Sequence, residues 1–184
     1  LSTGLEARYD YLEAPASIKG QKASDNTEAI YLQDELQIIK LLQITAGLRL
    51  NRNESFGWRL TPKLSAMLKV NDLRIRASWS QGFKTPTLKE LNYHYARDMN
   101  GMILFLGNPN LKTSQEHRFS AEYSLRCDSI DQNINISADG TLVHNARSQS
   151  YTYDLNTGIR TYRPENIGSG NWKLGTKLSW SRAI

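Results

Sequence analysis

The side chains best suited to hold a ligand stand together at Tyr93, His94 and Tyr95. Imidazole and phenolate groups both ligate iron, including the iron of haem. No Ser–His–Asp arrangement or carboxylate pair is set by a motif or by spacing. The single cysteine, Cys127, excludes a CxxC redox or metal motif. We therefore expect a ligand-binding segment at 93–95, no enzyme active site, no protein-held metal and no cofactor.

Charge and composition exclude several other classes. The chain of 184 residues carries a net charge of +5, and its Lys and Arg residues are spread along the whole sequence without a basic block. This distribution predicts no nucleic-acid partner. A hydrophobic fraction of 39% excludes a disordered chain, whereas no apolar run is long enough for a membrane helix. His117 and His144 are isolated in the sequence, and we expect both to be solvated.

Alternation of apolar and polar residues dominates the chain. In segment 58–70 every second residue, from Trp58 to Val70, is apolar, and the residues between them are polar with one exception. A strand places the two sets on opposite faces, whereas a helix would spread them around its circumference. The same pattern recurs and predicts eight strands, at residues 5–11, 30–36, 42–50, 58–70, 73–79, 119–125, 134–138 and 172–180.

The connections between these strands predict an antiparallel up-and-down meander. Tight turns are expected at 39–40, 70–72 and 128–131, and longer connections at 14–28, 84–114 and 147–166, with a short one at 52–57. Short turns at one edge and long loops at the other are typical of an outer-membrane β-barrel. The fold class expected is therefore all-β, as part of a transmembrane barrel.

Strand length supports the barrel without excluding every alternative. The 13 residues of 58–70, tilted as in a barrel, would rise roughly 33 Å, enough to cross the lipid-facing band. A soluble β-sandwich that binds a ligand such as a carbohydrate has the same periodicity. Such a module needs an exposed row of aromatics, whereas Trp58, Trp79, Trp172 and Trp180 fall on the apolar face. A barrel enzyme would need a nucleophile with a His partner, which nothing here nominates.

Two sequence motifs resemble those of TonB-dependent outer-membrane receptors. That family shows a strand ending in S-x-G-F-[KR]-x-P, a long surface loop, and then G-N-P-x-L. The matching residues of this chain are Gly82, Phe83, Pro86, Glu90, Asn108, Pro109, Asn110 and Leu111. Haem receptors of the family carry related F-R-A-P and N-P-N-L boxes with a functional His between them, which is the place of His94 in this sequence.

The resemblance implies that residues 1–184 are part of a larger barrel in the outer membrane of a Gram-negative bacterium. Such receptors have about 22 strands around a plug, so we expect an open sheet here, with the plug domain and closing strands absent. The implied partners are the TonB complex, through that plug domain, outer-membrane lipid, and an iron complex such as a siderophore or haem. Polar residues expected to face the lumen and contact the plug are Arg49, Arg59, Arg74, Arg76, Arg118 and Glu122.

Overall fold

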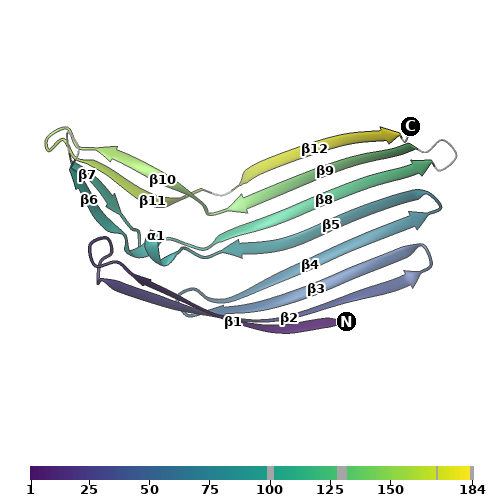
Figure 1. The fold of residues 1–184 in the computed structure, drawn as a ribbon, viewed down its shortest axis with the longest axis horizontal. Helices are drawn as coiled ribbons and strands as arrows, with labels where there is room; N and C mark the ends of the chain where they lie inside the picture. Colours follow the sequence, from purple (N-terminus) through teal and green to yellow (C-terminus); the bar gives the residue numbers. More distant parts are fainter. Residues whose placement is uncertain (99–101, 128–131, 169, 183–184) are drawn as a thin grey trace.

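One long antiparallel sheet forms most of the molecule (Figure 1). The structure, a computed structural model, describes residues 1–98, 102–127, 132–168 and 170–182. The eight strands of this sheet lie in the order β1-β2-β3-β4-β5-β8-β9-β12. Their bounds are Ser2–Glu13, Lys22–Ile39, Leu42–Asn53, Gly57–Val70, Leu73–Lys84, Ser114–Cys127, Gln132–His144 and Asn171–Arg182. All eight predicted strands and their antiparallel order are confirmed.

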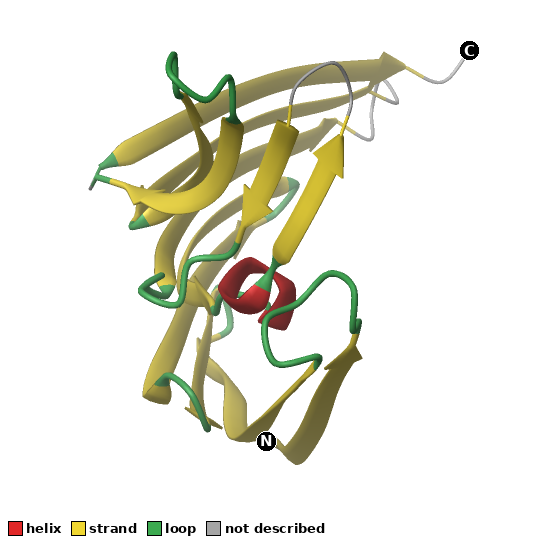
Figure 2. Cartoon of the chain, turned by 90° about the vertical axis from the view of Figure 1, so that its left-hand side faces the viewer, coloured by secondary structure: helices red, strands yellow, loops and turns green. Residues whose placement is uncertain are grey.

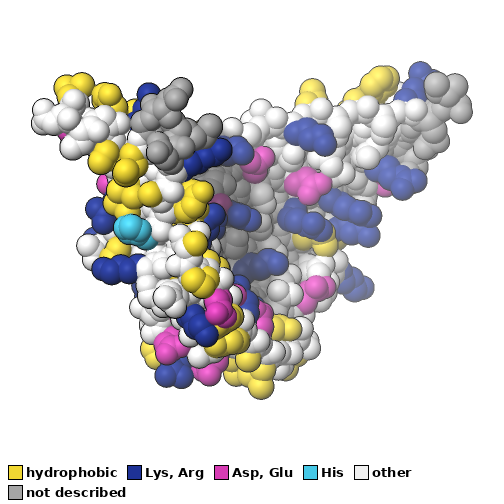
Figure 3. Space-filling model, turned by 60° about the vertical axis from the view of Figure 1, so that its left-hand side comes forward, with side chains coloured by type: hydrophobic (Ala, Val, Ile, Leu, Met, Phe, Trp, Pro, Cys, Tyr) yellow, Lys and Arg dark blue, Asp and Glu magenta, His cyan; other side chains and the backbone are white. Residues whose placement is uncertain are grey.

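The register aligns residues of the same character across the strands. Ala46 of β3 pairs with Leu64 of β4, Leu64 with Trp79 of β5, and Trp79 with Phe119 of β8. Because successive residues of a strand point to opposite faces, this row and the residues two and four positions away along each strand make one continuous apolar face. The alternation in the sequence thus produces a sheet with one apolar and one polar face, and Figure 3 shows Lys and Arg side chains over the polar one.

Neither face of the sheet is covered by a packed core. Among the described residues, the buried hydrophobic side chains are Ile18, Ala29 and Leu111, whereas Trp58 and Leu174 on the apolar face are 61% and 78% exposed. Soluble domains bury such a face against a second layer. The open, unclosed sheet is what the resemblance to a large barrel predicted.

The long connections contain a second, four-stranded sheet that the sequence analysis did not predict. Its strands are β6 (His94–Asp98), β7 (Met102–Leu106), β10 (Ala146–Tyr153) and β11 (Arg160–Ile167), in the order β10-β11-β7-β6. A short helix, α1 (Leu88–Asn92), joins β5 to β6 and lies near the centre of the loop end of the molecule (Figure 2). The segment expected to be a loop at 147–166 is therefore largely strand, and the one at 84–114 contains α1, β6 and β7.

The first long connection is also shorter than expected. β2 begins at Lys22 and pairs with β1 as far as Glu13, so the connection covers 14–21 and not 14–28. Residues 22–29 escaped the prediction because they are mostly polar and lack alternation. Turns are present at 40–41 and 71–72, each within one residue of the predicted 39–40 and 70–72, whereas the predicted turn at 128–131 lies outside the described residues. In the described part of the chain, no helix is long and apolar enough to cross a membrane.

Candidate functional site

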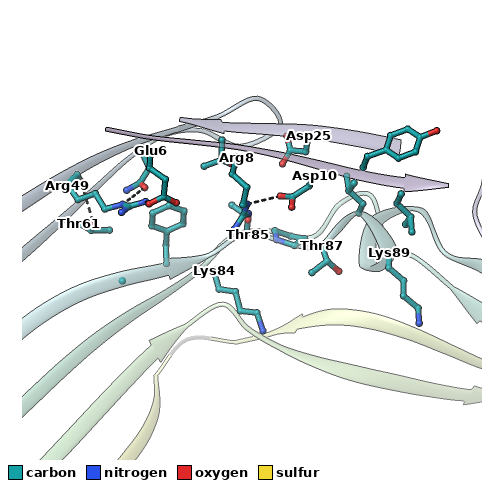
Figure 4. A pocket seen from close by; sticks show the side chains of 18 of the residues that line it. Glu6, Arg8, Asp10, Asp25, Arg49, Thr61, Lys84, Thr85, Thr87 and Lys89 are labelled. Atoms are coloured by element: carbon teal, nitrogen blue, oxygen red, sulfur yellow. Dashed lines mark hydrogen bonds and ion pairs between the residues drawn. The ribbon is translucent and has the colours of Figure 1, made fainter. Parts of the chain in front are cut away.

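An open cavity of about 740 Å³ lies on the polar face at the loop end of the sheet (Figure 4). Strands β1 to β4 provide one wall with polar side chains such as Arg8, Arg49 and Thr61. Residues 81–89, which lead from β5 into α1, provide the other wall. The cavity therefore lies where the polar face meets the long connections.

Ion pairs and hydrogen bonds satisfy the carboxylates of this cavity. Glu6 accepts from Nη2 of Arg49 at 2.9 Å, and Asp10 accepts from Nε of Arg8 at 2.9 Å. Asp25, which is buried, accepts from the side-chain amide of Asn53 at 2.6 Å. Figure 4 shows Lys84 and Lys89 extending away from these acidic groups. The positive charge left over in the cavity suits an anionic partner.

The first family motif builds the corner between β5 and α1. A Cβ atom added at Gly82 would meet nothing within 4 Å, and Pro86 is buried. Thr87 caps α1: its hydroxyl accepts from the backbone N–H of Glu90, and the Glu90 carboxylate accepts from the backbone N–H of Thr87. This reciprocal capping fixes the direction in which the chain leaves the strand.

The second family motif docks the end of the long loop onto α1. The backbone N–H of Gly107 donates to the Tyr93 carbonyl at 2.6 Å, and a Cβ atom at Gly107 would lie 2.6 Å from backbone atoms of Leu91 and Tyr93. Asn108 donates from its backbone to the Glu90 carbonyl at 2.8 Å. Leu111, 3% exposed, is one of the few buried apolar residues. Only glycine fits at position 107, because the backbone of Leu91 and Tyr93 leaves no room for a side chain.

Polar contacts join the two long connections to each other. The side-chain amide of Asn108 donates to the Pro164 carbonyl at 3.0 Å. Asn166 accepts from the backbone N–H of Lys112 at 2.7 Å and donates to the Asn145 carbonyl at 2.9 Å. Strands β7 and β11 also pair in parallel, with Phe105 opposite Tyr162 among their three registered pairs. Two segments distant in sequence thus form one unit.

The structure separates the three predicted ligand-binding side chains. The rings of Tyr93 and Tyr95 stack with centroids 6.1 Å apart, and both contact the ring of Phe105. His94 lies between them on β6, so strand alternation directs it to the opposite face, where it is exposed. The two tyrosines are brought together, and His94 is not.

The six side chains expected to face the lumen share the polar face. Arg76 stands opposite Glu122 in the register of β5 and β8. Arg74 and Arg118 lie an even number of residues away along the same strands, so their side chains point to the same face. Arg49 and Arg59 lie on the same face of β3 and β4. Their common face is the one that lines the lumen in a barrel whose apolar face meets lipid. Contact with a plug stays a prediction.

Several residues of this region escaped the sequence analysis. Phe105, Tyr162 and Arg147 were assigned to loops because β7 is a short apolar run without alternation, and β10 and β11 are short and mix aromatic with charged residues. The signal available was the alternation Tyr151, Tyr153 in one segment and Tyr93, Tyr95 in another. His117 and His144, expected to be solvated and apart, have ring centroids 6.0 Å apart, and His117 stacks on Trp79. The two histidines come together because β8 pairs with β9, which places His117 and His144 diagonally across from each other.

The described residues hold no group of three or more His, Cys, Asp or Glu side chains arranged to bind a metal ion. What the site offers instead is a positively biased cavity, a cluster of aromatic rings on the loop sheet, and donors from two joined connections. These groups can bind an anionic or aromatic molecule, but they provide no nucleophile paired with a base.

Two curated relatives of this chain are outer-membrane iron proteins by name. The "Iron-regulated outer membrane virulence protein" of Vibrio cholerae is 28% identical over 130 residues, which cover 67% of this chain and 20% of that protein. The "Ferric enterobactin receptor PirA" of Pseudomonas aeruginosa is 25% identical over 121 residues, or 59% of this chain and 16% of that protein. The chain thus matches about a fifth of the length of these relatives.

Solved structures share the fold. The siderophore receptor PirA from Pseudomonas aeruginosa superposes with a TM-score of 0.80 at 20% identity, over 97% of this chain and 35% of that one. A hemophore receptor, HasR of Serratia marcescens, solved with its hemophore and haem, gives a TM-score of 0.71 at 10% identity, over 97% of this chain and 39% of that one. At these identities the likeness establishes the architecture alone.

The family model that matches is described as "TonB dependent receptor-like, beta-barrel", and it covers residues 3–173. The match spans nearly the whole chain and agrees with the open meander and with the motif residues that build the loop end. The chain belongs to the TonB-dependent receptors of the Gram-negative outer membrane, and it forms part of their transmembrane β-barrel.

Proposed function

We propose that the complete receptor takes up a scarce iron complex across the outer membrane, with a ferric siderophore as the leading class. The observation that carries the proposal is the positively biased cavity at the loop end of the polar face, where Lys84 and Lys89 extend beyond the paired carboxylates. In an outer-membrane barrel the long loops lie outside the cell. An anionic iron complex arriving there would meet this cavity first.

The polar face of the sheet would contact a further domain in the complete receptor. We propose that a plug domain fills the lumen and contacts the polar wall through Arg49, Arg59, Arg74, Arg76, Arg118 and Glu122. Charge-assisted hydrogen bonds to arginine are strong and directional, which suits a contact that must hold and then release. TonB would act on that plug. No step of uptake alters the ligand chemically, so no enzyme activity is proposed.

A test uses the complete receptor in a strain that lacks its other iron receptors. Growth under iron limitation, with one ferric siderophore supplied at a time, should depend on the receptor for at least one of them. A Lys84→Ala, Lys89→Ala variant should bind that complex several-fold more weakly, whereas Lys69→Ala, on the polar face outside this cavity, should bind normally. The proposal fails if the receptor supports growth on no iron complex.

Haem is a second candidate, favoured by the exposed imidazole of His94, which lies between the two family motifs in the sequence. The HasR receptor, solved in complex with its hemophore and haem, has the same fold. A His94→Ala change in the complete receptor should weaken haem binding, as measured by the Soret absorbance of haem. Unchanged haem affinity would remove His94 from a binding role.

A further inference from the structure

Two histidines of neighbouring wall strands meet on the apolar face of the sheet, which would contact lipid in the complete barrel. His117 of β8 is opposite Leu142 of β9, and His144, two residues further along β9, points to the same face. The centroids of the two imidazole rings are 6.0 Å apart, and the ring planes are nearly perpendicular. We call His117 and His144 the histidine pair.

The ring nitrogens of the histidine pair are available to a ligand. Within the described part of the chain, neither imidazole makes a hydrogen bond or an ion pair, and His117 interacts with the rings of Trp79 and His144. Both histidines are half-buried, yet none of their ring nitrogens is among the buried polar atoms without a partner, so these nitrogens reach the surface. A neutral imidazole has one unprotonated nitrogen, which can bind a metal ion.

The neighbours of the histidine pair favour a metal ion over an anion. Gln81 is opposite His117, and Gln115 is opposite His144, all on the same face. No lysine or arginine stands beside the pair in the register of the described strands on this face. Protein sites for phosphate or carboxylate usually contain such a cation. Two adjacent imidazoles without a cation instead suit a divalent transition-metal ion.

We propose that the histidine pair binds one divalent transition-metal ion, such as Zn²⁺, Ni²⁺ or Cu²⁺, and thereby bridges β8 and β9. Imidazole suits these ions, whereas Ca²⁺ and Mg²⁺ take oxygen ligands. Gln115, directly opposite His144, offers a side-chain carbonyl, and water would complete the coordination. The proposal replaces the expectation that the chain holds no metal, and it does not depend on which iron complex the receptor takes up.

The distance between the two rings fits such a site after a small rotation. Two imidazoles that bind one ion tetrahedrally, through nitrogen–metal bonds of about 2.0–2.1 Å, have ring centroids roughly 5 Å apart. The rings of the pair are 6.0 Å apart and meet edge to face, so one ring must turn and move closer. Trp79 stacks on His117 with an interplanar angle of 10°, which holds that ring in place. We therefore expect His144 to turn about its χ2 bond, which is a soft torsion.

The position of the histidine pair gives the ion a structural role. β8 begins at Ser114 and β9 ends at His144, so the pair lies where both long connections join the wall. The Ser114 hydroxyl donates to the Asn145 carbonyl at 2.7 Å and already links the two strand ends. A bound metal ion would add a second link on the apolar face. Trp79 and Trp172 stand on the strands to either side, as expected near the edge of the lipid band, where ions have access from water.

The test measures Zn²⁺ binding to the complete receptor in detergent, produced without a polyhistidine tag and first treated with a chelator. Calorimetry should show a Zn²⁺ site that a His117→Gln, His144→Gln variant lacks, and each single variant should bind Zn²⁺ there about tenfold more weakly or worse. Only the difference between receptor and variant counts, because other parts of the receptor can also bind Zn²⁺. With Cu²⁺ as a second probe, the electron paramagnetic resonance spectrum should show coupling to two imidazole nitrogens, and to one in either single variant.

A gain of affinity separates metal binding from folding. Gln115→His places a third imidazole opposite His144 and should strengthen Zn²⁺ binding roughly tenfold. Thr141→His is the matched control, because it adds an imidazole to the other face of β9 and should change nothing at the pair. A gain confined to Gln115→His supports the site, even where the double variant does not fold.

Three results would overturn the inference. They are equal Zn²⁺ binding by the receptor and a folded double variant, no gain from Gln115→His, and an equal gain from Thr141→His. Each of them leaves the proposed uptake of an iron complex standing, because that function is measured by growth on an iron complex and not by Zn²⁺ binding.

Discussion

The two motif glycines, Gly82 and Gly107, have different physical roles. A side chain at Gly107 would collide with the backbone of Leu91 and Tyr93, whereas one at Gly82 would point into open space. We predict that Gly107→Ala detaches the end of the long connection from α1 at a cost of about 1–3 kcal/mol. Limited proteolysis of the complete receptor should then cut between residues 85 and 113 much faster. Gly82→Ala is the matched control, and equally fast cutting of that variant would contradict the explanation.

Asp154, at the tip of the β10–β11 hairpin, gives a prediction on pH. Hydrogen bonds from the Thr157 hydroxyl and then from the Asn156 N–H lower the pKa of Asp154 below its usual value. A lowered pKa means that the folded turn favours the carboxylate, so its contribution is present at neutral pH and lost as pH falls through the lowered pKa.

Amide exchange checks the role of Asp154. At pH 7 an Asp154→Asn variant should exchange the amides of the turn faster than the unchanged receptor, after correction for intrinsic rates. The difference should disappear in acid, once the carboxylate of Asp154 is protonated. Asn156→Ala keeps the carboxylate and the N–H donor, so it serves as the control. A difference that persists at the lowest pH would contradict the titration of Asp154.

At the scale of elements, the contact between the two long connections carries the site. Asn166 makes three hydrogen bonds to backbone groups of Lys112 and Asn145. We predict that Asn166→Ala loosens both connections together, at a cost of roughly 1–3 kcal/mol. Hydrogen exchange should rise in β7 and β11 at once. Asn171→Ala is the control, because its side chain makes a single long contact of 3.4 Å. Faster exchange in β11 alone would show that the connections move separately.

The elements also mark the limit of what the sequence predicted. The eight wall strands were found because each is long and faces lipid on one side and water on the other, so polarity alternates along much of its length. Phe105 and Tyr162 were not placed, because β7 is a five-residue apolar run without alternation and β11 is a short strand that mixes aromatic with charged residues. Their parallel pairing joins residues more than fifty positions apart, and neither local propensity nor alternation specifies such a contact. The motif residues were found by resemblance, but their structural reasons, such as the close approach at Gly107, required the fold.

At the scale of the whole molecule, the sheet lacks what a water-soluble domain needs. Its apolar face is uncovered, and its first and last strands, β1 and β12, each leave one row of backbone groups unpaired within the sheet. On β12 the exposed side chains of Leu174, Leu178 and Trp180 border that open edge. In a closed barrel, lipid would cover the face and neighbouring strands would pair with both edges. The stability of these residues therefore depends on their surroundings.

We predict that these 184 residues, produced by themselves, associate in aqueous buffer through the open edges and the apolar face. Sedimentation velocity should show large, heterogeneous species, and detergent should reduce their size while circular dichroism retains strand signal. A Leu174→Lys, Leu178→Lys variant should associate less, because charge on an edge strand opposes pairing and adhesion. Lys177→Ser, on the polar face of the same strand, is the control and should behave like the unchanged chain. A monodisperse monomer without detergent would show that the sheet is stable without lipid or neighbouring strands.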